Sequence, residues 1–570
     1  MPIQNPDNVC TKQDLADFYT KIRPYLAGFS SDNGGGGSDT LAGLNDVSLS
    51  TLSDGEVLKY SATESKWVNG EGGGSGGAGG SKITVTTISA ELIGATVTIS
   101  DGISSFTGTM GSDRSCTIDG VTAAGVLTVA AEIPGGASGS TTFDAPYYGV
   151  YTVQVNPQTI YGFHVDSSNS DPDACVSYHV QYNGANVANY DYANAYMDFA
   201  NDRWVWGDWL EDEFFMPRPC LVKQDYSEII YLNPNNYAMD VEGNSVSDKL
   251  TGSIDGYNAM MEWGRGGKLI WYKLVPDGAD PTSYTCYISN EQVDEDFHAW
   301  SFYNAADKLE DHFYTSIYTV SNISDVSRSL SGKGVFAYAF GRQFAAYAAK
   351  NNKNSESYAW SMDVFADRLL INFLTVLLIK SLNSDNIGYG YYTSQGYTTG
   401  EGNNKGLFYG THSSSFSKVF GMENYYANFN RAVEGVVCAN STFKYKLTYG
   451  QADGSSGNGY EVNSSNPSWY IVGDTVTGGI DDGYLSKQTS HTDGCLLPTK
   501  GGGSNGTYYC DGIRATYDNV RHCYAGGIGH PDHHKLSKCG MFSMEFNNNF
   551  DTAVQYVTTG LSLKPLIRTE

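Results

Sequence analysis

The sequence of 570 residues contains few basic side chains for its length. It has 35 Lys and Arg residues against 62 Asp and Glu residues, which gives a formal net charge of −27 at pH 7. An electrostatic field of this sign repels nucleic acids and anionic lipid surfaces. The charge balance therefore disfavours a DNA-binding or packaging role, and we expect no nucleic acid among the partners.

Long apolar runs and a secretory leader are also missing. Residues 369–377 form the longest apolar run, and even when extended to Leu382 it is shorter than the roughly 20 residues that span a bilayer. Asn372 interrupts this run. The first residues, MPIQNPDNVCTKQDLADF, show no basic region followed by an apolar stretch. We therefore expect no membrane insertion and no export by the Sec route, and we interpret the run as a buried helix.

The ten cysteines form no CxxC pair, which argues against zinc ribbons and redox motifs. The motifs GxxxxGK[ST], GxSxG and HExxH are absent as well, and no GxGxxG lies between a predicted strand and a helix. We expect mostly free thiols, which suits synthesis in a reducing cytoplasm. These absences favour a protein without a cofactor and without enzymatic activity.

Glycine and tyrosine are abundant instead. The chain has 66 Gly and 42 Tyr, while charged residues make up only 17%. Such a polar but weakly ionic surface suits β-rich extracellular or virion proteins and hydrogen-bonding paratopes. The length is several times the usual domain size of about 100 to 200 residues, so three or more folded units are expected.

The N-terminal segment, residues 1–35, is predicted to contain a short amphipathic helix. Thr11 can cap its start, and Pro24 and Gly28 favour its end. Its apolar stripe consists of Leu15, Phe18, Tyr19, Ile22 and Leu26. A helix this short cannot bury the stripe by itself, so we expect it to pack against sister chains or a docking protein. Packing onto its own chain is the alternative.

Two β-rich modules are predicted next. Residues 38–70 alternate apolar and polar side chains around an Asp54-Gly55 turn, which indicates a small β-module. Residues 70–81 have the Gly/Ser composition of a flexible linker. Residues 82–155 contain about seven short β-rich runs separated by Gly, Asp and Ser turns, a pattern typical of a β-sandwich. We expect this sandwich to act as a spacer, with direct binding as the alternative.

Residues 156–570 lack long linkers and predict one large α+β domain or two intimately packed ones. Aromatic-rich strands are expected at IIYLN, KLIWYKLV and YTCYIS, and helices around residues 337–350 and 358–382. The second helix has an apolar set at helical spacing that should form the core: Phe365, Leu369, Leu370, Phe373, Leu374, Leu377 and Leu378.

The N-terminal part resembles a known class of proteins. DLADFYTKIRPYLAG, followed by NDVSLSTLSDGEVLKYSATESKWVN, is similar to the start of many tailed-phage fibre and minor structural proteins, in which a helix precedes a short β-motif. The resemblance covers roughly residues 10–70. It implies a virion protein made in the bacterial host cytoplasm, docked to other virion proteins through its N-terminus and assembled as a homotrimer. The end of the 82–155 module, residues 147–155, resembles the closing strand of immunoglobulin-like or prealbumin-like spacers.

The large domain resembles phage proteins with a C-terminal C-type-lectin-like fold, some of which are variable adhesins of diversity-generating retroelements. The resemblance is carried by FFMPRPC, YNAMMEWGRGGKLIWYK, KVFGMENYYANFNRAVEGV and MFSMEF…LSLKPL. Relatives often have Trp-Gly-Asn-x-Trp after Gly-Met-Glu-Asn, whereas this chain has YANFN at residues 426–430, which preserves the aromatic spacing.

Residues 511–550 are the expected ligand-binding surface, because a lectin-like fold displays variable loops on a rigid scaffold. The candidate binding residues are Arg514, Tyr517, Asn519, Arg521, His522, Tyr524, His530, His533 and His534. Adenine mutagenesis of Asn codons would also enrich Asn, Tyr, Asp and His, a hypothesis that a template repeat and reverse transcriptase in the encoding genome would test.

A metal site and a glycosidase site are two chemical alternatives. The HPDHH stretch has metal-ligand side chains, but its Pro and Gly neighbours exclude helical spacing, so an exposed polar loop without a metal is expected. Paired carboxylates could indicate a glycosidase. The acidic clusters Asp208, Glu211, Asp212, Glu213 and Asp294, Glu295, Asp296 are more often solvated surface.

The sequence thus predicts a multidomain fold with an N-terminal helix and small β-module, an immunoglobulin-like β-sandwich and a C-terminal α+β C-type-lectin-like domain. The expected function is that of a tail-fibre-like virion appendage, an adhesin that attaches to a bacterial surface glycan or protein during host attachment. A head fibre or capsid decoration protein is one alternative, and a glycan-degrading tail appendage is the other.

Overall fold

A computed structural model describes most of the chain, which divides into two compact units, residues 1–158 and 159–570. The residues it does not describe are 1–46, 49–55, 62–65, 72–79, 88–91, 135–137, 146–148, 156–158, 305–307, 354–357, 389–396, 412–416, 427, 440, 449–470, 476–482, 516–520, 528–538, 547–551, 555–556 and 566–570. The predicted N-terminal helix and its apolar stripe lie outside the described residues, and so does the Asp54-Gly55 turn.

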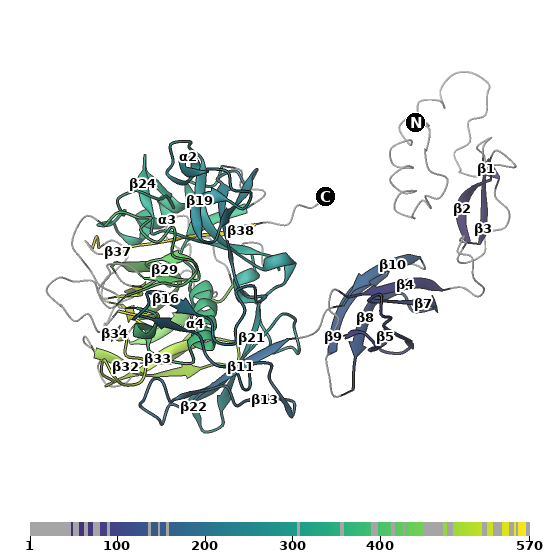
Figure 1. The fold of residues 1–570 in the computed structure, drawn as a ribbon, viewed down its shortest axis with the longest axis horizontal. Coiled ribbons are helices and arrows are strands. Elements are labelled where there is room, and N and C mark those ends of the chain that lie inside the picture. The colour runs from purple at the N-terminus through teal and green to yellow at the C-terminus, as the bar shows by residue number, and fades with distance from the viewer. Residues whose placement is uncertain are drawn as a thin grey trace, which may run out of the picture. The chain divides into compact units, whose positions relative to one another are not determined.

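The first unit is built from short strands that hydrogen-bond in small sheets (Figure 1). One sheet has the order β1-β3-β2, and its strands are β1 (Val47–Ser48), β2 (Glu56–Ser61) and β3 (Lys66–Glu71). β2 and β3 are antiparallel, with Tyr60 opposite Trp67. Because β3 runs to Glu71, the first residues of the predicted linker belong to a strand.

Two further sheets of this unit enclose one hydrophobic core. Their orders are β10-β4-β7 and β6-β5-β8-β9, and the strands are β4 (Ser81–Thr86), β5 (Thr96–Ser100), β6 (Ser105–Thr109), β7 (Ser115–Val121), β8 (Gly125–Glu132), β9 (Ser138–Ala145) and β10 (Val150–Gln154). Alternate side chains of each strand point inward, for example Ile83, Val85, Leu127 and Val129, which are all 0% exposed.

The second unit contains three larger sheets. The four-stranded one has the order β12 (Val176–Ser177), β11 (Ile160–Val165), β22 (Asp280–Ser289) and β21 (Trp271–Asp277). The seven-stranded one has the order β19 (Asn236–Asp240), β18 (Ile229–Asn233), β17 (Arg218–Lys223), β20 (Tyr257–Trp263), β23 (Phe313–Ser316), β38 (Leu561–Pro565) and β26 (Tyr358–Met362). β38 thus inserts between strands that lie some two hundred residues earlier.

The third sheet of this unit has nine strands among the described residues. Its order is β31 (Ile471–Thr475), β30 (Thr442–Tyr445), β29 (Asn430–Ala439), β35 (Arg521–Ala525), β36 (Met544–Glu545), β34 (Gly512–Arg514), β32 (Gly483–Ser490) and β33 (Leu496–Gly501), and β37 (Val557–Thr558) pairs with β29. Short hairpins complete the strands: β13 (Gln181–Tyr182) with β14 (Ala185–Asn186), β15 (Tyr196–Asp198) with β16 (Arg203–Val205), β24 (Ser321–Ile323) with β25 (Val326–Arg328), and β27 (Lys418–Val419) with β28 (Met422–Glu423). The chain is therefore β-rich with several sheets, as the sequence predicted.

Helices are few in the described part of the second unit: α2 (Ser247–Leu250), α3 (Gly341–Ala349), α4 (Phe365–Ile379) and the 3-10 turns η3 (Arg265–Gly267), η4 (Trp300–Phe302) and η5 (Ser384–Asn386). None of them has the length and apolar character needed to cross a membrane. The helix predicted for residues 358–382 is wrong in its first part. Residues 358–362 form β26, because pairing with β38 overrides their local pattern.

α4 forms the centre of the second unit, where it contacts both β11 and β29 (Figure 1). All of its residues are buried, including the polar side chains of Asp367, Arg368, Asn372 and Thr375. The helix ends at Lys380, whose φ of 52° is left-handed. The prediction that this apolar run is a buried core helix is confirmed.

Candidate functional site

The C-terminal residues expected to bind ligand lie partly on three neighbouring strands, β34, β36 and β35. Arg514 on β34 and Tyr524 on β35 both stand opposite Glu545 of β36. The guanidinium of Arg514 is 3.5 Å from the Glu545 carboxylate. The nine-stranded sheet therefore does bring part of the predicted set together.

His522 and Tyr524, however, are core residues, so the prediction that they bind ligand at the surface is wrong. They are 0% and 1% exposed, because β35 is a central strand between β29 and β36. The Nε2 atom of His522 lies 3.1 Å from the carbonyl oxygen of Val433, and burial lowers the pKa of His522 to about 3. Arg514 and Arg521 are half-buried and keep access to solvent.

The other members of the predicted set are Tyr517, Asn519, His530, His533 and His534, and they lie outside the described residues.

The acidic clusters considered for glycan hydrolysis make structural contacts. Glu213 accepts a hydrogen bond of 2.6 Å from the Tyr161 hydroxyl, and burial raises its pKa. The carboxylates of Asp294 and Asp296 form ion pairs with Lys273, with distances of 2.8 and 2.9 Å to its Nζ atom. These carboxylates therefore serve the packing of the chain around them.

A cluster that sequence reasoning missed lies on β17, β18, β20 and β23. We call it the Arg218 cluster, and it consists of Arg218, Tyr226, Tyr231, Glu262, His312 and Tyr314. Arg218 is directly opposite Glu262, and Glu262 is directly opposite Tyr314, so three adjacent strands place these side chains on one face. Arg218 and Glu262 belong to segments that carry the lectin-like resemblance, which was the one signal for them in the sequence.

Glu262 is the buried centre of the Arg218 cluster. It is 4% exposed, and its carboxylate accepts hydrogen bonds from Arg218 Nε at 3.2 Å, from the Tyr231 hydroxyl at 3.0 Å and from the Tyr314 hydroxyl at 3.1 Å. The Arg218 guanidinium also lies over the Tyr231 ring, 4.2 Å from its centroid. These contacts hold the half-exposed Arg218 and Tyr231 in one orientation.

Further hydrogen bonds connect the cluster to His312. The Tyr226 hydroxyl is 2.6 Å from His312 Nε2 and 3.0 Å from the Tyr314 hydroxyl. Tyr226 has a φ of 54°, a strained value for a bulky residue, and the turn that holds it joins β17 to β18. The side chain of His312 is 26% exposed, so these hydrogen bonds end near solvent.

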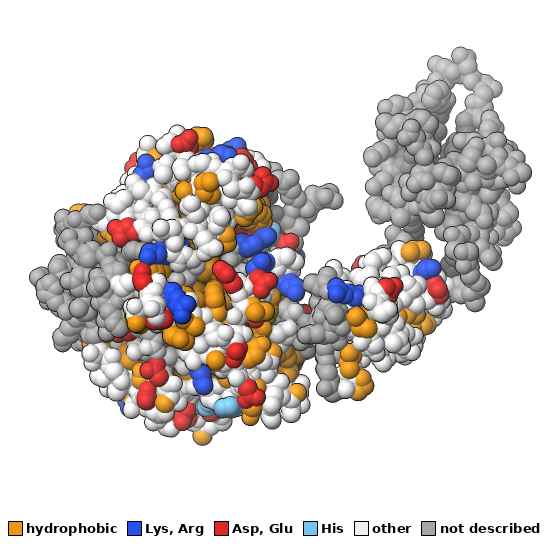
Figure 2. Space-filling model, viewed as in Figure 1, with side chains coloured by type: hydrophobic (Ala, Val, Ile, Leu, Met, Phe, Trp, Pro, Cys, Tyr) orange, Lys and Arg blue, Asp and Glu red, His pale blue; other side chains and the backbone are white. Residues whose placement is uncertain are grey.

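The phenols of the cluster are hydrogen-bond donors at neutral pH. Burial, followed by the charge of Glu262, raises the pKa of Tyr231 to about 12, and burial also raises the pKa of Tyr226 and Tyr314. A half-exposed Arg with preoriented aromatic hydroxyls is suited to bind hydroxyl-bearing or carboxylate-bearing ligands. On the face in Figure 2, charged side chains are interspersed with uncharged ones.

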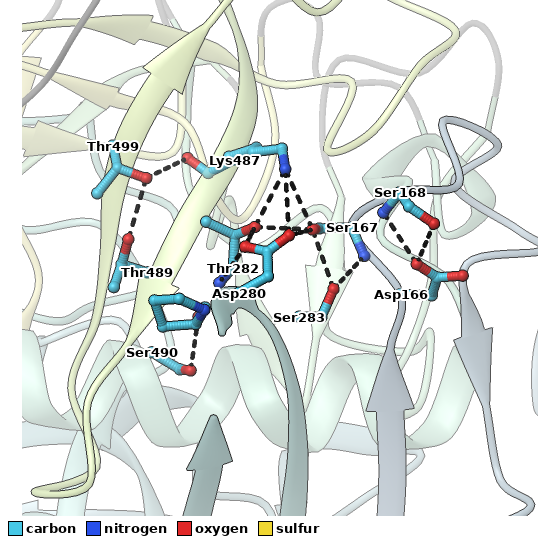
Figure 3. A network of polar contacts seen from close by, with 11 residues as sticks. Asp166, Ser167, Ser168, Asp280, Thr282, Ser283, Lys487, Thr489, Ser490 and Thr499 are labelled. Carbon is cyan, nitrogen blue, oxygen red and sulfur yellow. Dashed lines mark hydrogen bonds and ion pairs between the residues drawn. The ribbon is translucent and has the colours of Figure 1, made fainter. Parts of the chain in front are cut away.

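A separate polar network joins segments far apart in the sequence (Figure 3). Lys487 of β32 lies 3.3 Å from the Thr282 hydroxyl and 3.5 Å from the Asp280 carboxylate, both on β22. The hydroxyl of Ser167, which follows β11, lies 2.7 Å from the Thr282 hydroxyl and donates a hydrogen bond to the Asp280 carboxylate. Because these groups bond to one another, the network connects two sheets and is not our candidate binding site.

Tyr231→Phe tests whether Glu262 orients the cluster. Removing the hydroxyl deletes one of three donors to a buried carboxylate, so we expect the free energy of unfolding to fall by about 1–3 kcal/mol. Urea denaturation of the full chain measures it. Tyr196→Phe, on an exposed residue, is the control and should be neutral; an equal loss in both variants would contradict the orienting role.

Comparisons with known proteins assign no family. No protein-family model and no curated protein matches the chain. Among solved structures, a DUF4876 family protein from Bacteroides thetaiotaomicron VPI-5482 is 12% identical over 36% of this chain and 48% of that one, with a TM-score of 0.11. The match spans less than half of that protein, and a likeness this low carries no conclusion about fold or function.

Proposed function

We propose that this chain is a virion appendage protein of a tailed phage, similar to a tail fibre, that binds a receptor on the bacterial surface and catalyses no reaction. In this proposal residues 1–35 dock to other virion proteins and assemble three chains. The sheets of residues 82–155 are an immunoglobulin-like spacer, and the second unit is a C-type-lectin-like binding domain. The sequence resemblances described above and the β-rich modular organisation support it.

The Arg218 cluster is the observation that carries the binding function. It combines a half-exposed arginine with aromatic hydroxyls held by one buried carboxylate, and such preorganisation lowers the ordering cost of binding. Arginine and tyrosine are also the residues enriched at energetically dominant contacts. Several copies on one virion would strengthen weak individual contacts by raising the effective concentration.

The test is binding of the fluorescently labelled full chain to a panel of bacterial strains. We expect strain-selective binding, and we expect Arg218→Lys to weaken it about tenfold or more, because lysine keeps the charge but loses the planar contacts to Glu262 and Tyr231. Arg203→Lys is the matched control, since Arg203 is 69% exposed and lies on a short hairpin. Equal melting temperatures of the variants exclude unfolding as the cause.

Other outcomes decide between the alternatives. Binding to no strain would overturn the adhesin proposal and favour a structural role on the virion. Release of reducing sugar from bacterial envelopes would favour a glycan-degrading appendage. Immunogold labelling of virions with antibodies to this chain separates a tail fibre from a head fibre or capsid decoration protein.

A further inference from the structure

Three buried ionisable side chains of the second unit lie on neighbouring elements, and we call them the Lys564 triad. Lys564 lies on β38, Asp367 in the first turn of α4, and Glu434 on β29, and each is 2% exposed. The Lys564 Nζ atom is 2.6 Å from Asp367 Oδ1. Glu434 is placed beside the start of α4 by its backbone bridge to Val364 and by a hydrogen bond of 2.9 Å from its N–H to the carbonyl oxygen of Asp363.

The neighbours of the triad hold the amine against the Asp367 carboxyl group. Ser562 donates a hydrogen bond of 2.9 Å to Asp367 Oδ2, while Lys564 occupies Oδ1. Lys564 Nζ also donates to the Ser301 carbonyl at 2.5 Å and lies 4.2 Å from the centre of the Phe313 ring. Contacts on both carboxyl oxygens and on the amine fix the two groups side by side, and such fixation is the condition under which effective concentrations become very high.

Burial also favours the protonation states that such a reaction needs. Desolvation lowers the pKa of Lys564, opposed by the charge of Asp367, and desolvation raises the pKa of Asp367 and of Glu434. The amine is thereby moved towards its neutral, nucleophilic form. The two carboxyl groups are moved towards their neutral acid forms, in which hydroxyl can leave as water.

We propose that Lys564 and Asp367 condense to an intramolecular amide after folding, with Glu434 transferring the protons. The Lys564 nitrogen attacks Asp367 Cγ, and an N–C bond forms. Glu434, which starts as the neutral acid, donates its proton to the Asp367 hydroxyl, the C–O bond breaks and one water leaves. The resulting Glu434 carboxylate then accepts a proton from the nitrogen. No oxidant, reductant or cofactor is consumed, and Glu434 ends in its starting protonation state.

The amide would connect α4 to β38 across 197 residues of sequence. β38 is a short strand inserted between β23 and β26, and a covalent link would add to the sheet hydrogen bonds and to the side-chain contacts of Ser562 and Lys564 that hold it there. The neighbouring buried pair Arg431 and Asp363 has similar burial but cannot react in this way, since a guanidinium stays protonated. A buried lysine at this position therefore allows chemistry that arginine does not.

The test is the intact mass of the purified full chain under denaturing conditions. We expect a mass about 18 Da below the value calculated from the experimentally determined N-terminus, because one water is lost. Proteolysis should then release a linked peptide pair that contains Asp367 and Lys564. A mass equal to the calculated one overturns the proposal, and so does a water loss that fragmentation assigns to any other residue.

Substitutions test the role of each residue of the triad. Lys564→Arg keeps the charge and should have its full calculated mass, whereas Lys405→Arg, at a partly exposed lysine 3.3 Å from Asp202, should keep the loss of one water. Water loss that persists in Lys564→Arg overturns the amide. Glu434→Gln should show incomplete conversion, and complete conversion would overturn its part in proton transfer. The mass of the unmodified sequence decides the main point even if a variant folds poorly.

Discussion

Arg431→Ala is expected to lower the free energy of unfolding by about 3–5 kcal/mol, the range for removing one partner of a buried ion pair. The Arg431 guanidinium is 1% exposed, and its Nε atom lies 2.7 Å from Asp363. Its loss leaves Asp363, which is 8% exposed, without this cation. The cavity that both residues line has a volume of about 10 Å³, room for about one water and not for a hydrated counterion.

Urea denaturation of the full chain measures this loss, provided that the slope of the transition stays unchanged. The matched control is Arg203→Ala, whose exposed guanidinium is 3.6 Å from Asp198. Exposed pairs contribute about 0–1 kcal/mol, so this variant should be nearly neutral. Similar losses in the two variants would mean that the buried pair has access to water or to another compensating charge.

The second large expected effect is a loss of stability in acid that depends on His522. Burial lowers its pKa to about 3 from the ordinary 6.5, so between these values the unfolded chain binds a proton that the folded chain does not. The contribution of His522 to the free energy of unfolding is therefore fully present above pH 6.5 and is lost as the pH decreases towards 3. A shift of this size corresponds to on the order of 5 kcal/mol.

His522→Leu should flatten the pH dependence of the unfolding free energy between pH 6.5 and 4, since leucine does not titrate. Asp385 acts in the opposite direction: burial raises its pKa to about 7, so its contribution is lost as the pH rises from about 3.8 to 7. Asp385→Asn therefore provides the second comparison and should steepen the acid loss. An unchanged pH profile in His522→Leu would show that the imidazole titrates in the folded chain.

A structural feature can be predicted from the sequence when the residues that determine it are close together along the chain. The short β-rich runs of residues 82–155, separated by turn residues, predicted strands that the structure contains, because strand propensity and turn residues act over only a few residues. The mostly apolar run that became α4 was likewise predicted as a buried helix, since apolar side chains at helical spacing form a surface that must be covered. Residues 358–362 were assigned to the wrong element, because their partner strand β38 lies near the other end of the sequence.

The candidate site was less predictable for the same reason. His522 and Tyr524 look like exposed loop residues in a Gly-rich segment, but strand pairing on both sides of β35 buries them. Arg218, Glu262 and Tyr314 belong to three separate segments, and only the register of β17, β20 and β23 brings them onto one face.

By itself, the sequence determined the acidic charge, the Gly/Ser-rich stretches, the β-rich character and the apolar core of α4. These follow from composition and short-range periodicity, which act within a few residues. The tertiary structure alone decided which strands are central, which polar side chains are buried and which charges meet. Long-range pairing decides these features. The free energy of a buried charge depends on its partners, and a partner such as Asp367 lies 197 residues from Lys564 along the chain.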